Sequence, residues 1–316
     1  MRPDLILGVD GGGTKMMLAL ADRNGTFLRT GFGGGVNAMD NPGWRDELSR
    51  CLEPFRHQEG LVSVAAALPV FGEVATISRQ LDEVVNRAFP NARTRVLNDV
   101  DAAHLGAFAG RSGILLLSGT GSMAWARDRA GESFRVGGWG DIVGDEGSSH
   151  WIGRLALNAV SQSIDRRSAP TALTEAIFSH LGLDRNNPME SLGSWATAHA
   201  RRSSIAALAA VVDRTAAAGD DTAIAVLELA ADQLASHHLA IAAQCEPGAN
   251  WTYAGGTFRS RLLLDALAKR IGRPPVCPRL PPIGGALFAA AQLLDWPTDE
   301  GWIERVAKSA KAAFEH

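Results

Sequence analysis

The chain has little of what would tie it to a secreted, membrane-spanning or nucleic-acid-binding class of protein. Among its 316 residues are only three cysteines, Cys51, Cys245 and Cys277, too far apart for a C-x-x-C pair or a disulfide framework. Lys and Arg number 31 against 34 Asp and Glu, and a net charge of -3 gives no electrostatic case for nucleic acid. No apolar run reaches the roughly 18 residues of a membrane span, and the N-terminus lacks the pattern of a signal peptide. We therefore expect a cytoplasmic protein with free thiols and no membrane partner.

A glycine-rich turn near the N-terminus carries the clearest chemical signal. In LILGVDGGGTKMMLAL, residues 5–20, an apolar run ends in Asp10, glycines follow, and a second apolar run begins after Thr14 and Lys15. This order predicts strand, turn and strand, whereas a P-loop has Lys directly after its second glycine and a helix behind it. Glycine lets backbone N–H groups approach a phosphate, and Thr14 and Lys15 add a hydroxyl and a cation. Asp10 places a carboxylate where nucleotide-bound Mg²⁺ needs one, although an ordinary glycine hairpin also fits the pattern.

The first half of the chain predicts three antiparallel strands followed by alternating helices and strands. Asn24-Gly25 is a tight-turn signal, and Asn41 with Pro42 predicts the cap of a helix that runs to about His57. The remaining patterns predict strands over residues 5–10, 16–20, 27–32, 61–68 and 94–97, and helices over 72–89 and 100–109.

The same plan starts again near residue 113. Strands are expected over 114–117, 123–127 and 134–137, and a helical stretch then runs from 149 to about 244 with breaks near Pro170, Pro188 and Gly219. The chain continues with a strand over 251–254, a helix over 258–271, a short strand over 275–277 and a helix over 285–294. A repeated plan predicts two like α/β domains, residues 1–112 and 113–316, facing each other across a cleft. Recurrence by chance is the alternative.

Two later glycine turns have a composition similar to the first. SGTGS, residues 118–122, follows an apolar strand and offers backbone donors around Thr120 to a phosphate oxygen. Two such turns in a repeated chain suit a polyphosphate that is held from both sides. In AGGTFRS, residues 254–260, Gly255 and Gly256 would let an adenine and a ribose lie flat on the backbone. A tight strand-to-helix turn explains this third segment equally well.

Asn98 and Asp99 are candidates for the chemistry. They end a strand, and α/β proteins place working residues at the carboxyl edge of a sheet. A carboxylate at Asp99 would take the proton of a substrate hydroxyl in phosphoryl transfer. We prefer it to Asp101, which the first turn of a helix explains fully, and we take His104 as structural.

The segment VGGWGDIVGDEG, residues 136–147, has the composition of a sugar site. An indole such as Trp139 covers the apolar face of a sugar, and carboxylates such as Asp145 accept hydrogen bonds from its hydroxyls. Asn37, in an earlier loop, would add an amide for a hydroxyl or an N-acetyl group. An acidic loop that caps the helix beginning near Ser148 is the alternative. Solvated helix faces explain the basic pair at residues 201 and 202.

Six motifs together resemble one known family. DGGGTK, NDVDAA, SGTGS, GGWGDIVGDEGS, AGGTFRS and PPIGGALFAA, in this order and spacing, resemble the BadF/BadG/BcrA/BcrD ATPase family and, within it, N-acetylglucosamine and bacterial glucosamine kinases. The likeness covers nearly the whole chain except residues 161–245. It implies the actin, hexokinase and heat-shock-chaperone ATPase fold, with two ribonuclease-H-like domains, a helical insertion in the second, and ATP and Mg²⁺ between them.

The resemblance also implies roles for single residues. Asp99 is the expected base for a sugar 6-hydroxyl, Asp10 would steer Mg²⁺ through water, and Gly284 and Gly285 match a hinge-side connection before final helices that pack back on the first domain. The expected ATP contacts are Gly11, Gly12, Gly13, Thr14, Lys15, Gly119, Thr120, Gly121, Gly255, Gly256 and Ser260. The expected amino-sugar contacts are Asn37, Asn98, Asp99, Gly138, Trp139 and Asp145.

Departures from the family narrow the expected function. Dehydratase activators hold an iron–sulfur cluster with cysteines that this chain lacks as a pair, and repressor-type sugar kinases add DNA-binding or zinc motifs that are absent from the sequence. We therefore expect an ATP-dependent kinase for the 6-hydroxyl of N-acetylglucosamine, with glucosamine and N-acetylmuramic acid as alternative acceptors. An ATPase that switches a partner protein is the alternative from another class. A homodimer is a possible assembly.

Overall fold

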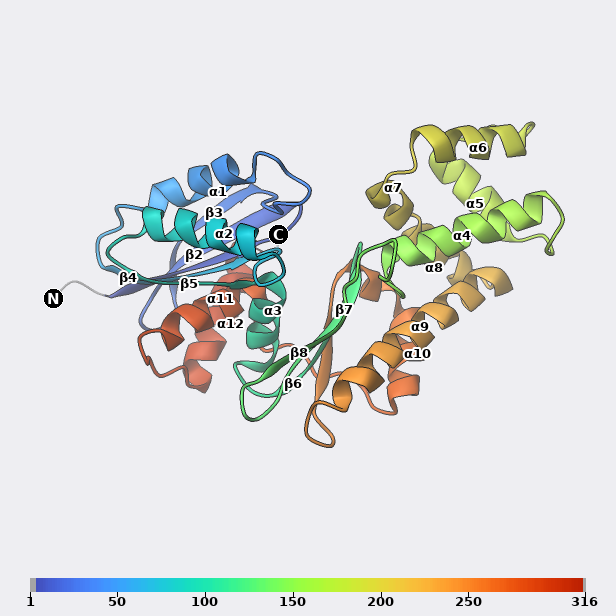
Figure 1. The fold of residues 1–316 in the computed structure, drawn as a ribbon. Coiled ribbons are helices and arrows are strands. Elements are labelled where there is room, and N and C mark those ends of the chain that lie inside the picture. Colours follow the sequence, from blue (N-terminus) through green and yellow to red (C-terminus); the bar gives the residue numbers. More distant parts are fainter. Residues whose placement is uncertain (1–3, 315–316) are drawn as a thin grey trace. The chain divides into compact units, whose positions relative to one another are not determined.

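The computed structural model describes residues 4–314 of the chain, and their contacts divide them into two compact units (Figure 1). Unit 1 contains the described residues up to Ser112 together with those from Cys277 onwards, and unit 2 contains Gly113–Val276. The sequence analysis assigned everything after residue 112 to the second domain and let only the final helices pack on the first. The structure groups the whole segment after residue 276 with unit 1. This segment packs closely against the first strand of unit 1. A Cβ at Gly8, in that strand, would lie 2.8 Å from Leu287 Cγ.

Unit 1 is built on a five-stranded sheet with the order β3-β2-β1-β4-β5. Its strands are β1 (Leu5–Gly11), β2 (Lys15–Asp22), β3 (Phe27–Gly34), β4 (Leu61–Leu68) and β5 (Arg93–Asn98). The first three strands are antiparallel to one another, while β4 runs parallel to β1 and β5 runs parallel to β4. The five strands predicted for this part of the chain are confirmed.

Alternation along β1 decides which helices cover each face of this sheet. Leu5, Leu7 and Val9 share one buried core with α1 and α2, whereas Ile6 shares the other with α3, α11 and α12. Side chains two positions apart in a strand point to the same face, so unit 1 has three layers (Figure 1). The helices are α1 (Trp44–Leu52), α2 (Ala75–Ala88), α3 (Asp99–Phe108), α11 (Pro282–Gln292) and α12 (Glu300–Phe314).

The first helix is shorter than predicted. It starts at Trp44, because Asn41 Oδ1 accepts a hydrogen bond from Gly43 N at 2.9 Å and bends the chain before the helix. A 3₁₀ turn over Glu53–Phe55 follows its end. Pro54 lies in that turn, and proline cannot continue an α-helix because it lacks an N–H and its ring clashes with the preceding turn.

Unit 2 repeats the strand order of unit 1 with one strand fewer. Its sheet has the order β8-β7-β6-β9, with β6 antiparallel to β7 and parallel to β9. The predicted strand over 275–277 is wrong: Val276 N donates to Trp251 O at 2.8 Å, but no strand forms there in the described chain. Pro274 and Pro275 have no N–H for a ladder, which explains the difference. The strands are β6 (Gly113–Ser118), β7 (Ser122–Arg127), β8 (Ser133–Gly137) and β9 (Trp251–Ala254).

The predicted helical stretch of unit 2 is confirmed, including its three breaks. It packs into one apolar core with the inner faces of β6 and β7 and with α10 (Arg261–Ile271). The helices of the stretch are α4 (Ser149–Ile164), α5 (Ala172–Leu181), α6 (Pro188–Ala198), α7 (Arg202–Ala207), α8 (Ala209–Ala217) and α9 (Asp221–Ala242). None of the helices in the described part of the chain is long and apolar enough to span a membrane.

Two further helices begin later than predicted. α2 does not begin at Gly72, because that residue has a φ of +81°, outside the helical region. α10 begins after a 3₁₀ turn over Gly256–Arg259 rather than at Phe258. The buried Ser260 lies between them, and its hydroxyl accepts a hydrogen bond from Leu263 N at 3.2 Å, which caps α10.

Candidate active site

The first glycine turn closes the β1–β2 hairpin and leaves its polar side chains exposed. Gly12 N donates to Lys15 O at 2.8 Å, which closes the turn. A Cβ at Gly35 would lie 2.0 Å from Gly13 O, so the loop after β3 packs directly behind it. Thr14 and Lys15 are exposed. The turn therefore presents a hydroxyl and an ammonium group from a backbone that is held on both sides.

The carboxylates of Asp10 and Asp99 lie at the same edge of the first sheet. Parallel strands carry both to that edge, one within β1 and one directly after β5. Desolvation and the neighbouring Asp99 carboxylate raise the pKa of Asp10 to about 7, against a lowering by Lys15. Desolvation also raises the pKa of Asp99 to about 6, with a smaller contribution from Glu73 and against the hydrogen bond that Val100 N donates to its carboxylate. The structure thus brings together two predicted site residues, both with perturbed pKa values.

Asn98 is buried, and its side chain is bonded inside unit 1. Its Oδ1 accepts a hydrogen bond from Val100 N at 3.0 Å and caps α3. Its Nδ2 donates to Phe71 O at 2.9 Å and to Glu73 Oε1 at 3.3 Å. The amide that was predicted to contact a sugar therefore fixes the backbone that carries Asp99.

The structure gives Asp101 and Asn37 different surroundings. Asp101 is buried in the first turn of α3, with Oδ2 3.7 Å from Arg95 Nη2. Asn37 stabilises its own loop, because its Oδ1 accepts a hydrogen bond from Met39 N at 2.9 Å and its Nδ2 donates to Asp40 Oδ2 at 2.8 Å. The ion pair with Arg95 explains Asp101 within unit 1.

The second and third glycine turns pack against each other within unit 2. A Cβ at Gly255, which has a φ of +108°, would lie 2.1 Å from Ser118 O. Thr257 Oγ1 donates to Gly119 O at 3.3 Å. Thr120 is exposed at the tip of its turn. The predicted second phosphate motif and the predicted adenosine motif therefore form one continuous backbone surface.

An ion pair that the sequence analysis missed lies against the second turn. Asp145 is only 3% exposed, has a left-handed backbone with a φ of +58°, and pairs with Arg202 at the start of α7. Its Oδ1 also accepts a hydrogen bond from Ser122 N at 3.2 Å, and a Cβ at Gly121 would lie 3.0 Å from Arg202 Nη2. The two partners are 57 positions apart, so no local pattern could have linked them.

The loop around Trp139 presents an apolar surface to solvent. Trp139 is 70% exposed, Val143 is 76% exposed and Ile142 is 96% exposed. The Arg135 guanidinium lies 5.7 Å from the centroid of the indole and is the one cation stacked on it among the described residues. Gly138 precedes the indole with a φ of +74°, which favours glycine. An indole that stays largely exposed to solvent fits the predicted sugar contact.

Three glycines in the predicted nucleotide turns are not required by the fold. A Cβ at Gly13, Gly119 or Gly256 would meet no atom within 4 Å, and none of the three has a positive φ. Gly193, on the exposed surface of α6, also has both properties. Close approach of a bound group to the backbone would explain glycine at the three turn positions. These turns therefore fit a nucleotide.

Gly284 and Gly285, which were matched to a hinge-side connection, serve close packing inside unit 1. A Cβ at Gly285 would lie 1.9 Å from Ala102 O, and a Cβ at Gly284 would lie 2.9 Å from Leu280 Cβ. Both glycines lie near the start of α11, which crosses α3 at this point. Close packing within unit 1 explains both glycines, and the hinge-side role stays a prediction.

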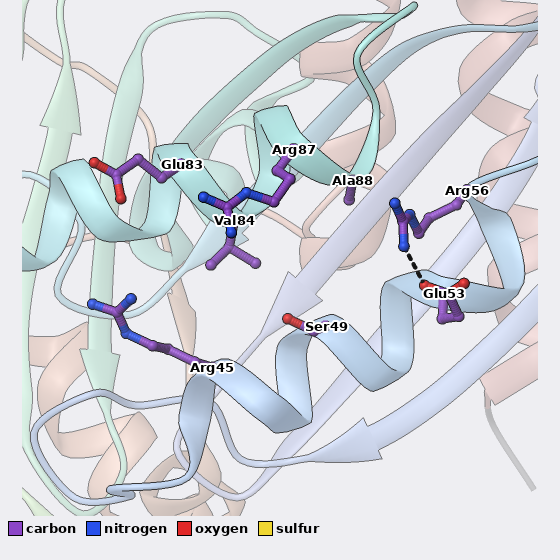
Figure 2. A pocket seen from close by; sticks show the side chains of 8 residues that line it. All are labelled: Arg45, Ser49, Glu53, Arg56, Glu83, Val84, Arg87 and Ala88. Atoms are coloured by element: carbon purple, nitrogen blue, oxygen red, sulfur yellow. Dashed lines mark hydrogen bonds and ion pairs between the residues drawn. The ribbon is translucent and has the colours of Figure 1, made fainter.

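Two cavities lie away from the predicted site residues. One of about 130 Å³ lies between α1 and α2 and has charges of both signs, with Arg56 paired to Glu53 at 2.8 Å (Figure 2). The other, of about 490 Å³, is largely apolar and lies among α4, α6 and α7, where Trp195 and Ile205 contribute to its lining. Within the described residues, no group of three or more His, Cys, Asp or Glu side chains could hold a metal ion.

Comparisons with known proteins identify the family. The model of the BadF/BadG/BcrA/BcrD ATPase family matches residues 7–290. The N-acetylmuramic acid/N-acetylglucosamine kinase of Clostridium acetobutylicum is 29% identical over 238 residues, which cover 72% of this chain and 76% of that protein. The N-acetyl-D-glucosamine kinase of Dictyostelium discoideum is 25% identical over 295 residues, which cover 86% of this chain and 91% of that protein.

A solved structure extends the likeness to three dimensions. A protein of Chromobacterium violaceum, named provisionally as an N-acetylglucosamine kinase, matches with a TM-score of 0.73 and 26% identity, over 90% of this chain and 98% of that one. The chain belongs to the BadF/BadG/BcrA/BcrD ATPase family. Its two sheets, with their shared strand order, are those of the actin-like ATPase fold. The predicted family and the predicted fold class are confirmed.

Proposed function

We propose that this protein is an ATP-dependent sugar kinase that transfers the γ-phosphoryl group of ATP to the 6-hydroxyl of an amino sugar, with N-acetylglucosamine as the first candidate. The observation that carries the proposal is the set of Gly13, Gly119 and Gly256, one in each nucleotide motif, where the fold itself has no need of glycine. The kinase names of the relatives from Clostridium acetobutylicum and Dictyostelium discoideum support the choice of acceptor.

Asp99 is the proposed general base. Its pKa of about 6 leaves the carboxylate mostly ionised near neutral pH, yet basic enough to accept a proton. In the reaction it takes the proton of the 6-hydroxyl while the sugar oxygen forms a bond to the γ-phosphorus and the bond to the ADP oxygen breaks. Asn98 acts indirectly, because its cap on α3 holds the backbone of Asp99 in place.

Asp10 is the proposed residue for holding Mg²⁺ through water. Bound Mg²⁺ would neutralise charge on the phosphates. A single carboxylate beside a second one suits a hydrated divalent cation, because the negative charge of Asp99 acts on Asp10 more strongly than the positive charge of Lys15. Thr14 and Lys15 in the first turn, and Thr120 in the second, would donate hydrogen bonds to phosphate oxygens.

Trp139 is the proposed platform for the sugar ring. Its exposed indole would cover the apolar C–H face of the sugar, while the neighbouring Asp141 offers an exposed carboxylate to hydroxyls. Asp145 contributes less directly, because Arg202 and Ser122 N already engage its oxygens. Glucosamine and N-acetylmuramic acid stay as alternative acceptors, since a single hydroxyl or acyl contact decides among them.

The direct test measures ADP release from Mg-ATP with N-acetylglucosamine, glucosamine, N-acetylmuramic acid, glucose and no sugar. Release that depends on one amino sugar supports the proposal and names the acceptor. The Asp99→Asn variant, assayed in parallel, should lose this release and retain nucleotide binding.

The same assay tests the alternative class of function. ADP release that ignores every sugar would contradict a kinase and support an ATPase that switches a partner protein. The position of the phosphate on the product, read from ³¹P–¹H coupling in NMR spectra, tests the 6-hydroxyl separately. A phosphate on another hydroxyl would overturn the assigned acceptor atom and leave the kinase activity intact.

A further inference from the structure

The second glycine turn has no charged residue of its own, yet a guanidinium lies against it. The turn sequence SGTGS contains only Ser, Gly and Thr. Arg202 Nη2 lies 3.0 Å from the position that a Cβ at Gly121 would occupy. In the first turn, by contrast, Lys15 is part of the turn sequence itself. Arg202 thus brings to the second turn the positive charge that the first turn carries locally.

The fold holds Arg202 firmly at this place. Its guanidinium pairs with the buried Asp145, and its Nε lies 4.0 Å from Asp141 Oδ2. Helix α7 is in turn fixed against α4, because a Cβ at Gly153 would lie 2.0 Å from Ile205 O. A buried carboxylate and a close helix contact therefore orient the arginine before any ligand binds.

The guanidinium also keeps part of its surface open. The Arg202 side chain is 41% exposed, whereas the Asp145 side chain is 4% exposed. Among the described residues, Asp145 and Asp141 are the acidic partners of Arg202, which leaves other N–H groups of its planar fork accessible. Arginine in such a setting binds phosphate oxygens well, since two parallel N–H groups match two oxygens.

We propose that Arg202, supplied by the helical insertion, binds the terminal phosphates of the nucleotide at the second glycine turn. This inference rests on the proposed function only in taking SGTGS as a phosphate turn. In this arrangement Asp145 is a positioning residue that holds the arginine, and α7 links the helical insertion to the nucleotide. In the alternative, the Asp145–Arg202 ion pair only holds α7 against the loop after β8. The test must distinguish these two roles.

The experiment measures binding of ATP and of AMP by calorimetry, without sugar, to the wild type and to R202A, R202K and R201A. R202A loses a charge-assisted contact to the terminal phosphates, so its affinity for ATP should fall by about tenfold or more. Its affinity for AMP should change much less. R202K should recover part of the ATP affinity, because it keeps the charge and loses the fork. R201A removes the same charge from the neighbouring position, which has no part in the pair, and should bind both nucleotides as the wild type does.

A second variant tests the same contact without touching the arginine. Gly153→Ala should push α7 away from α4. Like R202A, it should therefore weaken the binding of ATP more than the binding of AMP. Equal losses for ATP and AMP in R202A, or no loss at all, would overturn the proposal and leave Arg202 a structural residue. Nucleotide binding is measured without an acceptor. Failure of the sugar assay would therefore refute the proposed kinase activity and not this inference. Sugar-dependent turnover with unchanged ATP affinity in R202A would refute only the inference.

Discussion

The two glycine-rich hairpin turns that follow β1 and β6 each join antiparallel strands, and they obtain their charges in different ways. In unit 1, Asp10 and Lys15 lie within a few positions of the turn glycines, and a hydrogen bond from Gly12 N to Lys15 O closes the turn. In unit 2 the turn sequence is uncharged, and its ion pair comes from Asp145 and Arg202, which are 57 positions apart. A glycine-rich hairpin turn can thus obtain its charges from local sequence or from tertiary contacts.

The sheets that carry these turns show a second difference. Both share the order of an antiparallel three-strand meander followed by a parallel strand, and only the sheet of unit 1 has a further strand, β5. β5 delivers Asn98 and Asp99 to the edge beside Asp10. At the corresponding place in unit 2, Pro274 and Pro275 prevent a strand. Unit 1 therefore contains the perturbed carboxylates, and unit 2 contains the exposed indole and the arginine.

The largest expected effect tests whether the chemistry belongs to unit 1. Asp99→Asn should lower kcat by about 10²–10⁴-fold, because it removes the general base, and should leave the Kd of ATP nearly unchanged. Wild-type kcat/KM should fall as the pH drops below about 6, where Asp99 becomes protonated. Asp101→Asn is the matched control on the same helix and should keep most of its turnover. Similar losses in both variants would contradict the assignment.

The next effect tests whether sugar recognition belongs to unit 2. Trp139→Ala should raise the KM for the sugar about tenfold or more and leave the KM for ATP nearly unchanged, since it removes an apolar platform of the acceptor. The melting temperature should stay the same, because the indole is 70% exposed. Leu239→Ala removes a side chain that is 75% exposed on α9 and serves as the control. Equal rises in both KM values would show that the indole shapes the fold rather than the sugar site.

A smaller effect compares the glycine turns directly. Gly13→Ala and Gly119→Ala should each weaken ATP binding by about tenfold, because a methyl group would lie where phosphate must approach the backbone. Neither should lower the melting temperature, since each Cβ has open space. Gly193→Ala is the control in α6 and should leave ATP binding unchanged while stabilising the helix by roughly 0.5–1 kcal/mol. Loss of stability in the turn variants would mean that the fold, not the ligand, requires these glycines.

The last comparison concerns stability, and it distinguishes the Asp10 carboxylate of unit 1 from the Asp145 carboxylate of unit 2. Desolvation raises the pKa of Asp10 in the folded protein to about 7, above the 3.8 of an unperturbed aspartate, so its contribution to stability is lost as the pH rises from about 4 through about 7. Asp10→Asn mimics the protonated form and should raise the free energy of unfolding above pH 7, by up to about 4 kcal/mol at roughly 1.4 kcal/mol per pKa unit. Asp145→Asn should instead lower it by about 1 kcal/mol, because it removes the partner of Arg202.

Urea unfolding of both variants at pH 5 and pH 8 measures these changes. Asp10→Asn should raise the free energy of unfolding more at pH 8 than at pH 5. Asp145→Asn should lower the free energy of unfolding at both pH values. A destabilised Asp10→Asn variant at pH 8 would show that the Asp10 carboxylate is stabilised in the fold rather than strained by it.

Much of the fold could be predicted because its signals are local. The run Leu61–Leu68 matches β4 at both ends, and Trp251–Ala254 matches β9, since unbroken apolar segments bounded by turn residues leave little choice of register. The errors lie at helix starts, where Asn41 bonds to Gly43 N and Gly72 takes a positive φ, and at Pro275, where a single backbone bond replaces a ladder. The intrinsic propensities of residues do not show which hydrogen bonds form at the ends of a helix or strand.

The sequence by itself determined the family, the order of the strands along the chain and the positions of the three glycine-rich turns, because those properties depend on composition and period along a few neighbouring residues. Only the tertiary structure decided that Asn98 serves Asp99, that Asp145 is held by Arg202, and that the chain returns to unit 1 after residue 276. These are contacts between distant segments, and their free energies depend on burial and on distances that only packing sets.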